Sequence, residues 1–159
     1  MGRKSVKENK NYYQICRENE GLTRAAASEK TGFVSAEKIE KIESDPKQAA
    51  PDIIYAMSKA YKASNLCNYY CSNECKIGQE YIPEIQIKNL SRITLEMLAS
   101  LNALDAEKNR LIEITSDENI SKEEAIEFHK IQDRLKEMAM AIDSLQLWME
   151  QAVADGKIK

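Results

Sequence analysis

The sequence predicts an all-α protein built from two parts. The first is a bundle of four or five short helices, and the second is a long antiparallel two-helix hairpin. Glycine and proline together account for only 8 of the 159 residues, whereas the helix-favouring residues Glu, Lys, Ala, Leu and Ile are abundant. Apolar residues recur at steps of three and four, which is the period of a helix rather than of a strand. Hydrophobic residues make up 43% of the chain and charged residues 31%, so we expect a folded, soluble protein.

The first two predicted helices are short and bounded by glycines. Helix one is expected over residues 11–20, and Gly21 can end it. Thr23 is a suitable N-cap for helix two, which is expected over residues 24–31 and contains three consecutive alanines. Such small side chains let a neighbouring helix cross close to the axis. Gly32 closes this helix.

The third and fourth helices complete the bundle. Ser35 is the next N-cap, and helix three is expected over residues 36–43 with Ile39 and Ile42 buried on one face. A loop with two prolines follows. Residues 52–63 then show the broad apolar face of another helix.

Residues 64–85 are less regular and carry three of the four cysteines. Cys67, Cys71 and Cys75 recur every four residues, so on one helix they would share a face. We expect a short helix here, followed by an extended linker. Structural zinc sites usually take four ligands, so no metal is assigned. The thiols are interpreted as small buried hydrophobes, with metal binding or redox chemistry as the alternative.

Residues 86–159 predict the helical hairpin. Ser121 and Glu124 form a capping box at the start of its last helix. Further apolar residues widen its stripe beyond what one partner helix can cover, so we expect a coiled-coil-like homodimer formed through residues 86–155. The apolar seam of this helix alternates steps of three and four: Phe128, Ile131, Leu135, Met138, Ile142, Leu145, Met149 and Ala152.

Charge is distributed unevenly along the chain. Residues 1–62 hold 12 Lys/Arg against 9 Asp/Glu, whereas residues 63–159 hold 11 against 17, so the halves carry +3 and −6. A module that faces phosphates would use the positive half, which begins with a basic arm of Arg3, Lys4, Lys7 and Lys10. No apolar run approaches the ~20 residues that cross a bilayer, and the first residues lack the apolar core of a signal peptide. The expected location is therefore the cytoplasm, with no membrane partner.

One family pattern emerges from the predicted bundle. Its residues are Arg17, Gly21-Leu22-Thr23, Glu29-Lys30, Gly32, Ile39, Ile42-Glu43 and Pro51. With these residues at these positions, residues 11–63 resemble the Cro/phage-repressor type of helix-turn-helix domain, often called the Xre family. The resemblance implies a compact λ-repressor-like bundle whose second and third helices form the DNA-reading unit. Together with the patterns of the later residues, it divides the chain into a DNA-binding domain (1–63), a cysteine-containing segment (64–85) and a hairpin, expected from its wide apolar stripe to dimerise (86–159).

The resemblance also implies which residues contact double-stranded DNA. Thr23 and Arg24 would approach the phosphate backbone at the start of helix two, and Lys47 would contact a phosphate from the following loop. The start of helix three would face base edges in the major groove through Ser35, Ala36, Glu37, Lys38 and Lys41. The function implied is a dimeric, sequence-specific transcriptional regulator.

A second interpretation is a non-catalytic protein-interaction adaptor that keeps the fold without reading DNA. The turn before helix three has an extra residue at Phe33-Val34, and Glu37 and Glu40 would repel phosphates. An enzyme is not expected under either interpretation. His129 is the single histidine, and no glycine-rich loop could cradle a phosphate. We therefore assign no catalytic residue and no cofactor.

Overall fold

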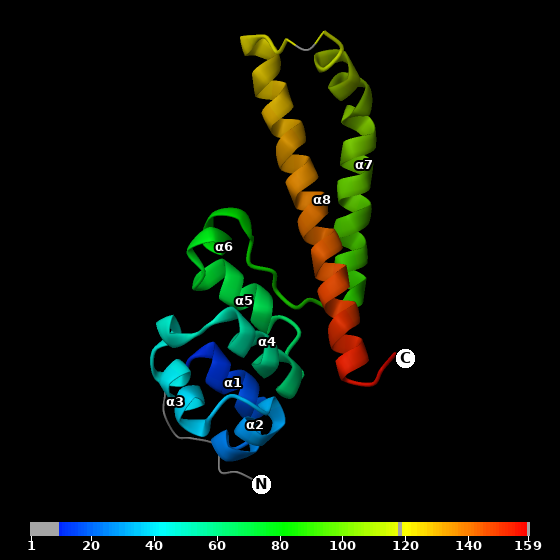
Figure 1. The fold of residues 1–159 in the computed structure, drawn as a ribbon. Helices are drawn as coiled ribbons and strands as arrows, with labels where there is room; N and C mark the ends of the chain where they lie inside the picture. Colours follow the sequence, from blue (N-terminus) through cyan, green and yellow to red (C-terminus); the bar gives the residue numbers. More distant parts are fainter. Residues whose placement is uncertain (1–9, 118, 159) are drawn as a thin grey trace. The chain divides into compact units, whose positions relative to one another are not determined.

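The computed structural model describes residues 10–117 and 119–158 (Figure 1), so Arg3, Lys4 and Lys7 of the basic arm lie outside the described residues. It confirms the all-α fold, because every regular element in the described ranges is a helix. The elements are α1 (Tyr12–Asn19), α2 (Arg24–Thr31), α3 (Ala36–Ser44), the 3-10 helix η1 (Pro46–Gln48), α4 (Pro51–Ala60), α5 (Leu66–Asn73), α6 (Lys76–Tyr81), α7 (Leu90–Ile114) and α8 (Lys122–Ala154).

The chain forms two compact units. The first comprises residues 1–86 together with 149–159, and the second comprises residues 87–148. At the C-terminal end of the first unit, the Gln151 amide nitrogen donates to the Lys62 carbonyl oxygen at 2.9 Å. The Gln151 amide oxygen accepts from the Ser64 hydroxyl at 2.9 Å. No helix in the described part of the chain is long and apolar enough to cross a membrane.

One apolar core holds the first unit together, and it extends beyond the predicted helix-turn-helix domain. Leu66 of α5 is fully buried in the same core as the residues of α1 to α4. Tyr69 of α5 packs on α1, with its ring centroid 4.5 Å from that of Tyr12 and 5.7 Å from that of Tyr13. The hydroxyls of Tyr13 and Tyr61 are buried, and neither has a hydrogen-bond partner among the described residues. The core residues are Tyr13, Cys16, Ala27, Val34, Ile39, Ile42, Ile54, Met57, Tyr61, Ala63 and Leu66.

The segment predicted as an extended linker contains a second short helix, so that expectation is wrong. α6 folds back on α5, and Gly78 makes the crossing possible. A Cβ at Gly78 would lie 2.0 Å from the Cys71 carbonyl oxygen, well inside van der Waals contact. The absence of a side chain at Gly78 lets the two backbones approach closely.

The second unit, residues 87–148, contains most of the helical hairpin predicted over residues 86–159, whereas residues 149–159 group with the first unit. α7 and α8 run antiparallel beside each other (Figure 1), and Arg110 of α7 forms an ion pair with Glu127 of α8. The capping box is confirmed, since the Glu124 amide donates to the Ser121 hydroxyl at 3.2 Å and the Glu124 carboxylate accepts from the Ser121 amide at 3.0 Å.

The predicted seam of α8 is only partly buried. Ile131 and Ala152 are buried, but Leu135, Ile142 and Met149 remain 42–50% exposed. Ala141, Ser144 and Leu147 are buried instead, although none was assigned to the seam. A helix paired with one neighbour hides only part of an apolar stripe, so one edge of the seam is left in water.

Candidate nucleic-acid interface

α2 and α3 form a helix-turn-helix with both predicted caps in place. The Thr23 hydroxyl accepts from the Ala26 amide at 3.1 Å, and the Ser35 hydroxyl accepts from the Lys38 amide at 3.2 Å. Ala27 is completely buried, which is consistent with a close crossing of the narrow α2. Gly32 ends α2 with a φ of 80°, a conformation that glycine adopts without strain. Besides the capped amide, the start of each helix keeps amide groups that have no acceptor within the helix.

α3 has one buried face and one open face. Ile39 and Ile42 are fully buried against the core. On the other side Ser35, Glu37 and Lys41 are exposed, while Ala36 and Lys38 are partly buried. Lys47 is exposed in η1, as is Thr23 at the start of α2. The residues predicted to contact DNA thus all retain some access to solvent.

A buried ion pair fixes the C-terminal part of α3 to α1. The Arg17 guanidinium contacts both oxygens of Glu43, with Nε to Oε1 at 2.6 Å and Nη2 to Oε2 at 3.1 Å. Arg17 Nη1 also donates to the Leu22 carbonyl oxygen at 2.6 Å, so the same side chain holds the turn before α2. The Glu43 side chain is only 1% exposed. Burial lowers the pKa of Arg17, but the hydrogen bond and charge of Glu43 outweigh it and leave that pKa above its ordinary value.

The family pattern in the sequence includes both Arg17 and Glu43, but nothing in it indicates that they form an ion pair. This contact was therefore not predicted from the sequence. The sequence did contain one signal for it, because Arg17 and Glu43 carry opposite charges and both occupy positions that the helical period places on a buried face. Losing one partner of such a pair would leave a buried charge uncompensated, which costs about 3–5 kcal/mol. The pair therefore makes the outward face of α3 part of a rigid framework.

Arg24 does not project freely toward a ligand. Its Nε atom donates to Glu43 Oε2 at 2.9 Å, and its Nη1 atom donates to Glu40 Oε1 at 2.6 Å. The Arg24 side chain is nonetheless 37% exposed and Glu40 is 58% exposed. Such exposed ion pairs are weak, so a phosphate that reached Arg24 would compete only with Glu40 for Nη1.

The extra residue of the turn is Phe33. Val34 is buried at 2% exposure and supplies the apolar contact of the turn, whereas Phe33 is 64% exposed. Phe33 lies two residues before the N-cap of α3, within ~8 Å of it by chain geometry. A large apolar ring is therefore exposed to solvent next to the start of α3.

The cysteines do not assemble a metal site. All four are free thiols; Cys16 is buried in the core, and Cys67, Cys71 and Cys75 are partly buried. Burial, together with the neighbouring thiols of Cys75 and Cys67, raises the pKa of Cys71, which keeps it protonated. No group of three or more His, Cys, Asp or Glu residues in the described ranges is placed to hold a metal ion.

Comparison with known proteins adds no relative to this geometry. No family model, curated protein or solved structure matches the chain.

Proposed function

We propose that the chain is a sequence-specific regulator of transcription that inserts α3 into the major groove of double-stranded DNA. The observation that carries the proposal is the support of α3 from behind. Two fully buried isoleucines and the Arg17–Glu43 pair hold the helix, while Ser35, Glu37 and Lys41 face solvent. An α-helix with its outward face free fits the width of the major groove.

Contacts to phosphate would orient the helix in the groove. The capped start of α2 at Thr23 offers amide groups and the positive end of a helix dipole. Lys47 is exposed beside α3 and forms no ion pair among the described residues. Lys38 and Lys41 can donate to guanine O6 and N7, and Glu37 can accept from cytosine N4.

Lys38→Glu and Lys41→Glu test the placement of α3. Each is expected to weaken binding to a selected oligonucleotide by about tenfold or more, because a groove contact of ~1–3 kcal/mol is replaced by repulsion. Fluorescence anisotropy measures the affinity, and Lys76→Glu on the exposed surface of α6 is the charge-matched control. If all three variants bind as the unaltered chain does, α3 does not enter the groove.

Salt dependence tests the phosphate contacts separately. The affinity should fall steeply between low and physiological salt, because each neutralised phosphate releases counterions. The same oligonucleotide and anisotropy measurement provide the slope. An affinity that ignores salt would exclude the contacts proposed for Thr23, Arg24 and Lys47.

We further propose that the active form is a homodimer through residues 86–155. Its support is a run of exposed apolar residues on the hairpin, which we call the exposed line. In α7 its members are eleven residues apart, which is about three helical turns, and in α8 they are seven apart, about two turns. The exposed line consists of Leu90, Leu101 and Ile112 of α7 with Leu135 and Ile142 of α8.

Both parts of the exposed line lie on the same side of the hairpin. Leu101 is eight residues beyond the buried Ile93, or about 80° around α7, and Ile142 is one residue beyond the buried Ala141, or about 100° around α8. Because the helices are antiparallel and both rotations have the same sense, the two parts are adjacent. A second copy related by a twofold axis would cover them.

A protein-interaction adaptor is the alternative, and the contacts of Arg24 favour it. Two carboxylates of α3 bind this arginine, so the positive charge that would meet a phosphate is partly neutralised. An adaptor would show no salt-dependent binding to any selected oligonucleotide, yet would retain the dimer.

A further inference from the structure

An exposed phenylalanine lies beside the helix that is proposed to read DNA. Phe33 is 64% exposed, and it precedes Ser35, the N-cap of α3, by two residues. Ser35 and Glu37, which the proposed function directs at base edges, are exposed as well. The ring of Phe33 therefore borders the surface that would face the major groove.

The structure of the turn fixes the side on which this ring lies. Exposure alternates along the turn, because Val34 is 2% exposed within the core while its neighbours Phe33 and Ser35 are both exposed. At the end of α2 the Thr31 hydroxyl lies 3.4 Å from the Val34 carbonyl oxygen, and the Ser35 hydroxyl caps α3. Both ends of the turn are thus held, and Phe33 shares its solvent-exposed side with Ser35.

Isolated apolar side chains are common on protein surfaces and need no explanation by themselves. Phe33 differs because the fold does not require it. Val34 already supplies the apolar contact of the turn, and Phe33 is not among the residues packed against the core. No aromatic ring or cation in the described ranges covers it. A large apolar ring is therefore left free next to α3.

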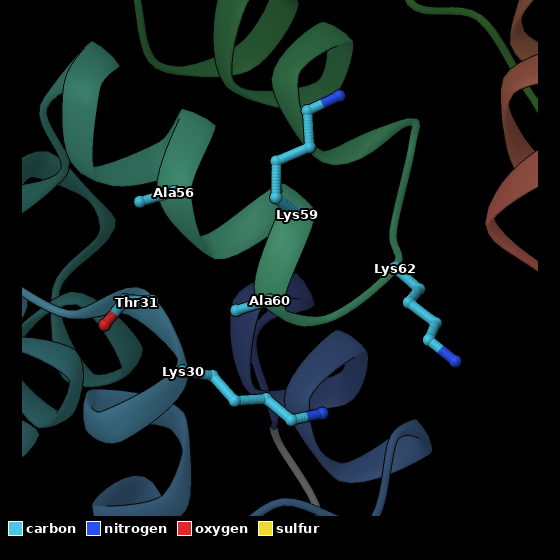
Figure 2. Close-up of a pocket in the computed structure, with 6 residues that line it drawn as sticks. All are labelled: Lys30, Thr31, Ala56, Lys59, Ala60 and Lys62. Carbon is cyan, nitrogen blue, oxygen red and sulfur yellow. The ribbon is translucent and has the colours of Figure 1, made fainter.

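Tyr55 of α4 shows the contrast. It is 60% exposed, yet its ring has a partner, since Lys59 Nζ lies 5.3 Å from the ring centroid. Figure 2 shows the Lys59 side chain extending away from Lys30 and Lys62. Tyr55 thus has a local contact of its own and is not one of the residues proposed to contact DNA, which makes it a matched control for Phe33.

The chemistry of the major groove restricts what such a ring can recognise. The base edges there present hydrogen-bond donors and acceptors, and the C5 methyl group of thymine is the one apolar group among them. A phenyl ring has no polar atom with which to read the donors and acceptors. Ser35 and Glu37 in turn read polar groups, so they leave this methyl group without a partner.

We propose that Phe33 is a specificity-determining residue that packs against the C5 methyl group of a thymine in the major groove. This thymine is next to the base that the start of α3 contacts through Ser35 or Glu37. The inference rests on the proposed insertion of α3 into the groove. It adds a preference for one base that charge and hydrogen bonding do not provide.

Replacement of thymine by uracil tests this contact, because deoxyuridine lacks only the C5 methyl group. Binding sites are first selected from a random pool with the full chain, and each thymine of the selected site is then replaced singly. At one thymine position we expect the unaltered chain to lose about fourfold in affinity, which corresponds to burying one methyl-sized group. Phe33→Ala should bind the thymine and uracil oligonucleotides equally at that position, since the partner of the methyl group is gone. Fluorescence anisotropy measures each affinity.

Two further variants separate the contact from an effect on the fold. Phe33→Leu keeps an apolar side chain and should retain the preference for thymine, and Tyr55→Ala should retain the full fourfold ratio. Circular dichroism should show an unchanged Tm in Phe33→Ala, because the ring is exposed. Loss of binding to every oligonucleotide in both Phe33→Ala and Phe33→Leu would mean that the ring has a structural role in the turn and would contradict the proposal.

The outcomes also distinguish the role of Phe33 from the proposed function. If the unaltered chain selects no oligonucleotide, the insertion of α3 fails and the thymine contact fails with it. If the chain binds a selected site with the expected salt dependence, but Phe33→Ala keeps the same ratio of thymine to uracil affinity at every position, only the role of Phe33 is overturned. An equal loss of affinity for all sequences in Phe33→Ala would place the ring against sugar or phosphate and would overturn that role as well.

Discussion

Cys16, Tyr12, Tyr13 and Tyr61 place ionisable groups within or against the core of the first unit. Burial raises the pKa of Cys16 from 9.0 to about 11 and that of Tyr12 from 10.0 to about 12. It raises the pKa of Tyr13 and of Tyr61 further still. In each case the neutral form is favoured because a charged form would lose its hydration.

These shifts predict unfolding by alkali. A raised pKa in the folded state contributes stability below the unfolded pKa, and that stability is lost as the pH rises through the folded pKa. Stability should therefore decline from about pH 9, where Cys16 ionises in the unfolded chain, toward pH 12. Urea unfolding at a series of pH values measures this decline.

The Cys16→Ala variant provides the control for this pH dependence. It is less stable at neutral pH because of the small cavity, but it should lose on the order of 2 kcal/mol less between pH 9 and pH 11. A decline of the same size in both proteins would show that Cys16 does not titrate as described.

Arg24 shows which residue-level properties could be predicted from the sequence. The caps at Thr23 and Ser35 could be predicted, because a cap acts on amides two or three residues away. The partners of Arg24 lie 16 and 19 residues along the chain, and they depend on how α2 crosses α3. A local sequence pattern carries no information about how two helices cross. Arg24 was therefore expected to be free, whereas in the structure it forms ion pairs with two glutamates.

At the scale of elements, α5 and α6 depend on one backbone contact. Gly78→Ala would place a methyl group 2.0 Å from the Cys71 carbonyl oxygen, so the two helices must separate. We expect a loss of about 1–3 kcal/mol in the free energy of unfolding, typical of overpacking. Urea unfolding measures it, with Glu80→Ala on the exposed side of α6 as the control. Equal stability in both variants would mean that α6 does not pack as described.

Helix boundaries were predicted best where caps and glycines define them, as in α2, α3 and the start of α8. α6 escaped prediction because it is six residues long and owes its stability to packing rather than to periodicity. The buried residues of α8 differ from the predicted seam for a related reason. Its residues have helical spacing, but the spacing alone does not tell which edge the neighbouring helix covers.

At the scale of the whole molecule, the hairpin is proposed to pair two copies of the chain. The double variant Leu101→Asp, Ile142→Asp should shift the protein from dimer to monomer, because it introduces four carboxylates into a twofold apolar interface. Light scattering coupled to gel filtration measures the mass at micromolar concentrations.

Leu95→Asp is the matched control for this experiment. Leu95 is 68% exposed on α7 but lies about 120° around the helix from Leu101, away from the exposed line. It should leave the dimer intact. A monomeric unaltered chain, or equal dissociation in all variants, would exclude the exposed line as the interface.

The buried hydroxyls of Tyr13 and Tyr61 mark two positions at which the fold could be made more stable. Each hydroxyl is buried without a hydrogen-bond partner in the described ranges, which costs free energy that a phenylalanine at the same position would not cost. In a lineage adapting to heat, these two oxygens would be among the first atoms to disappear. A protein needs only enough stability to stay folded at its working temperature, so a cost of this kind can be tolerated.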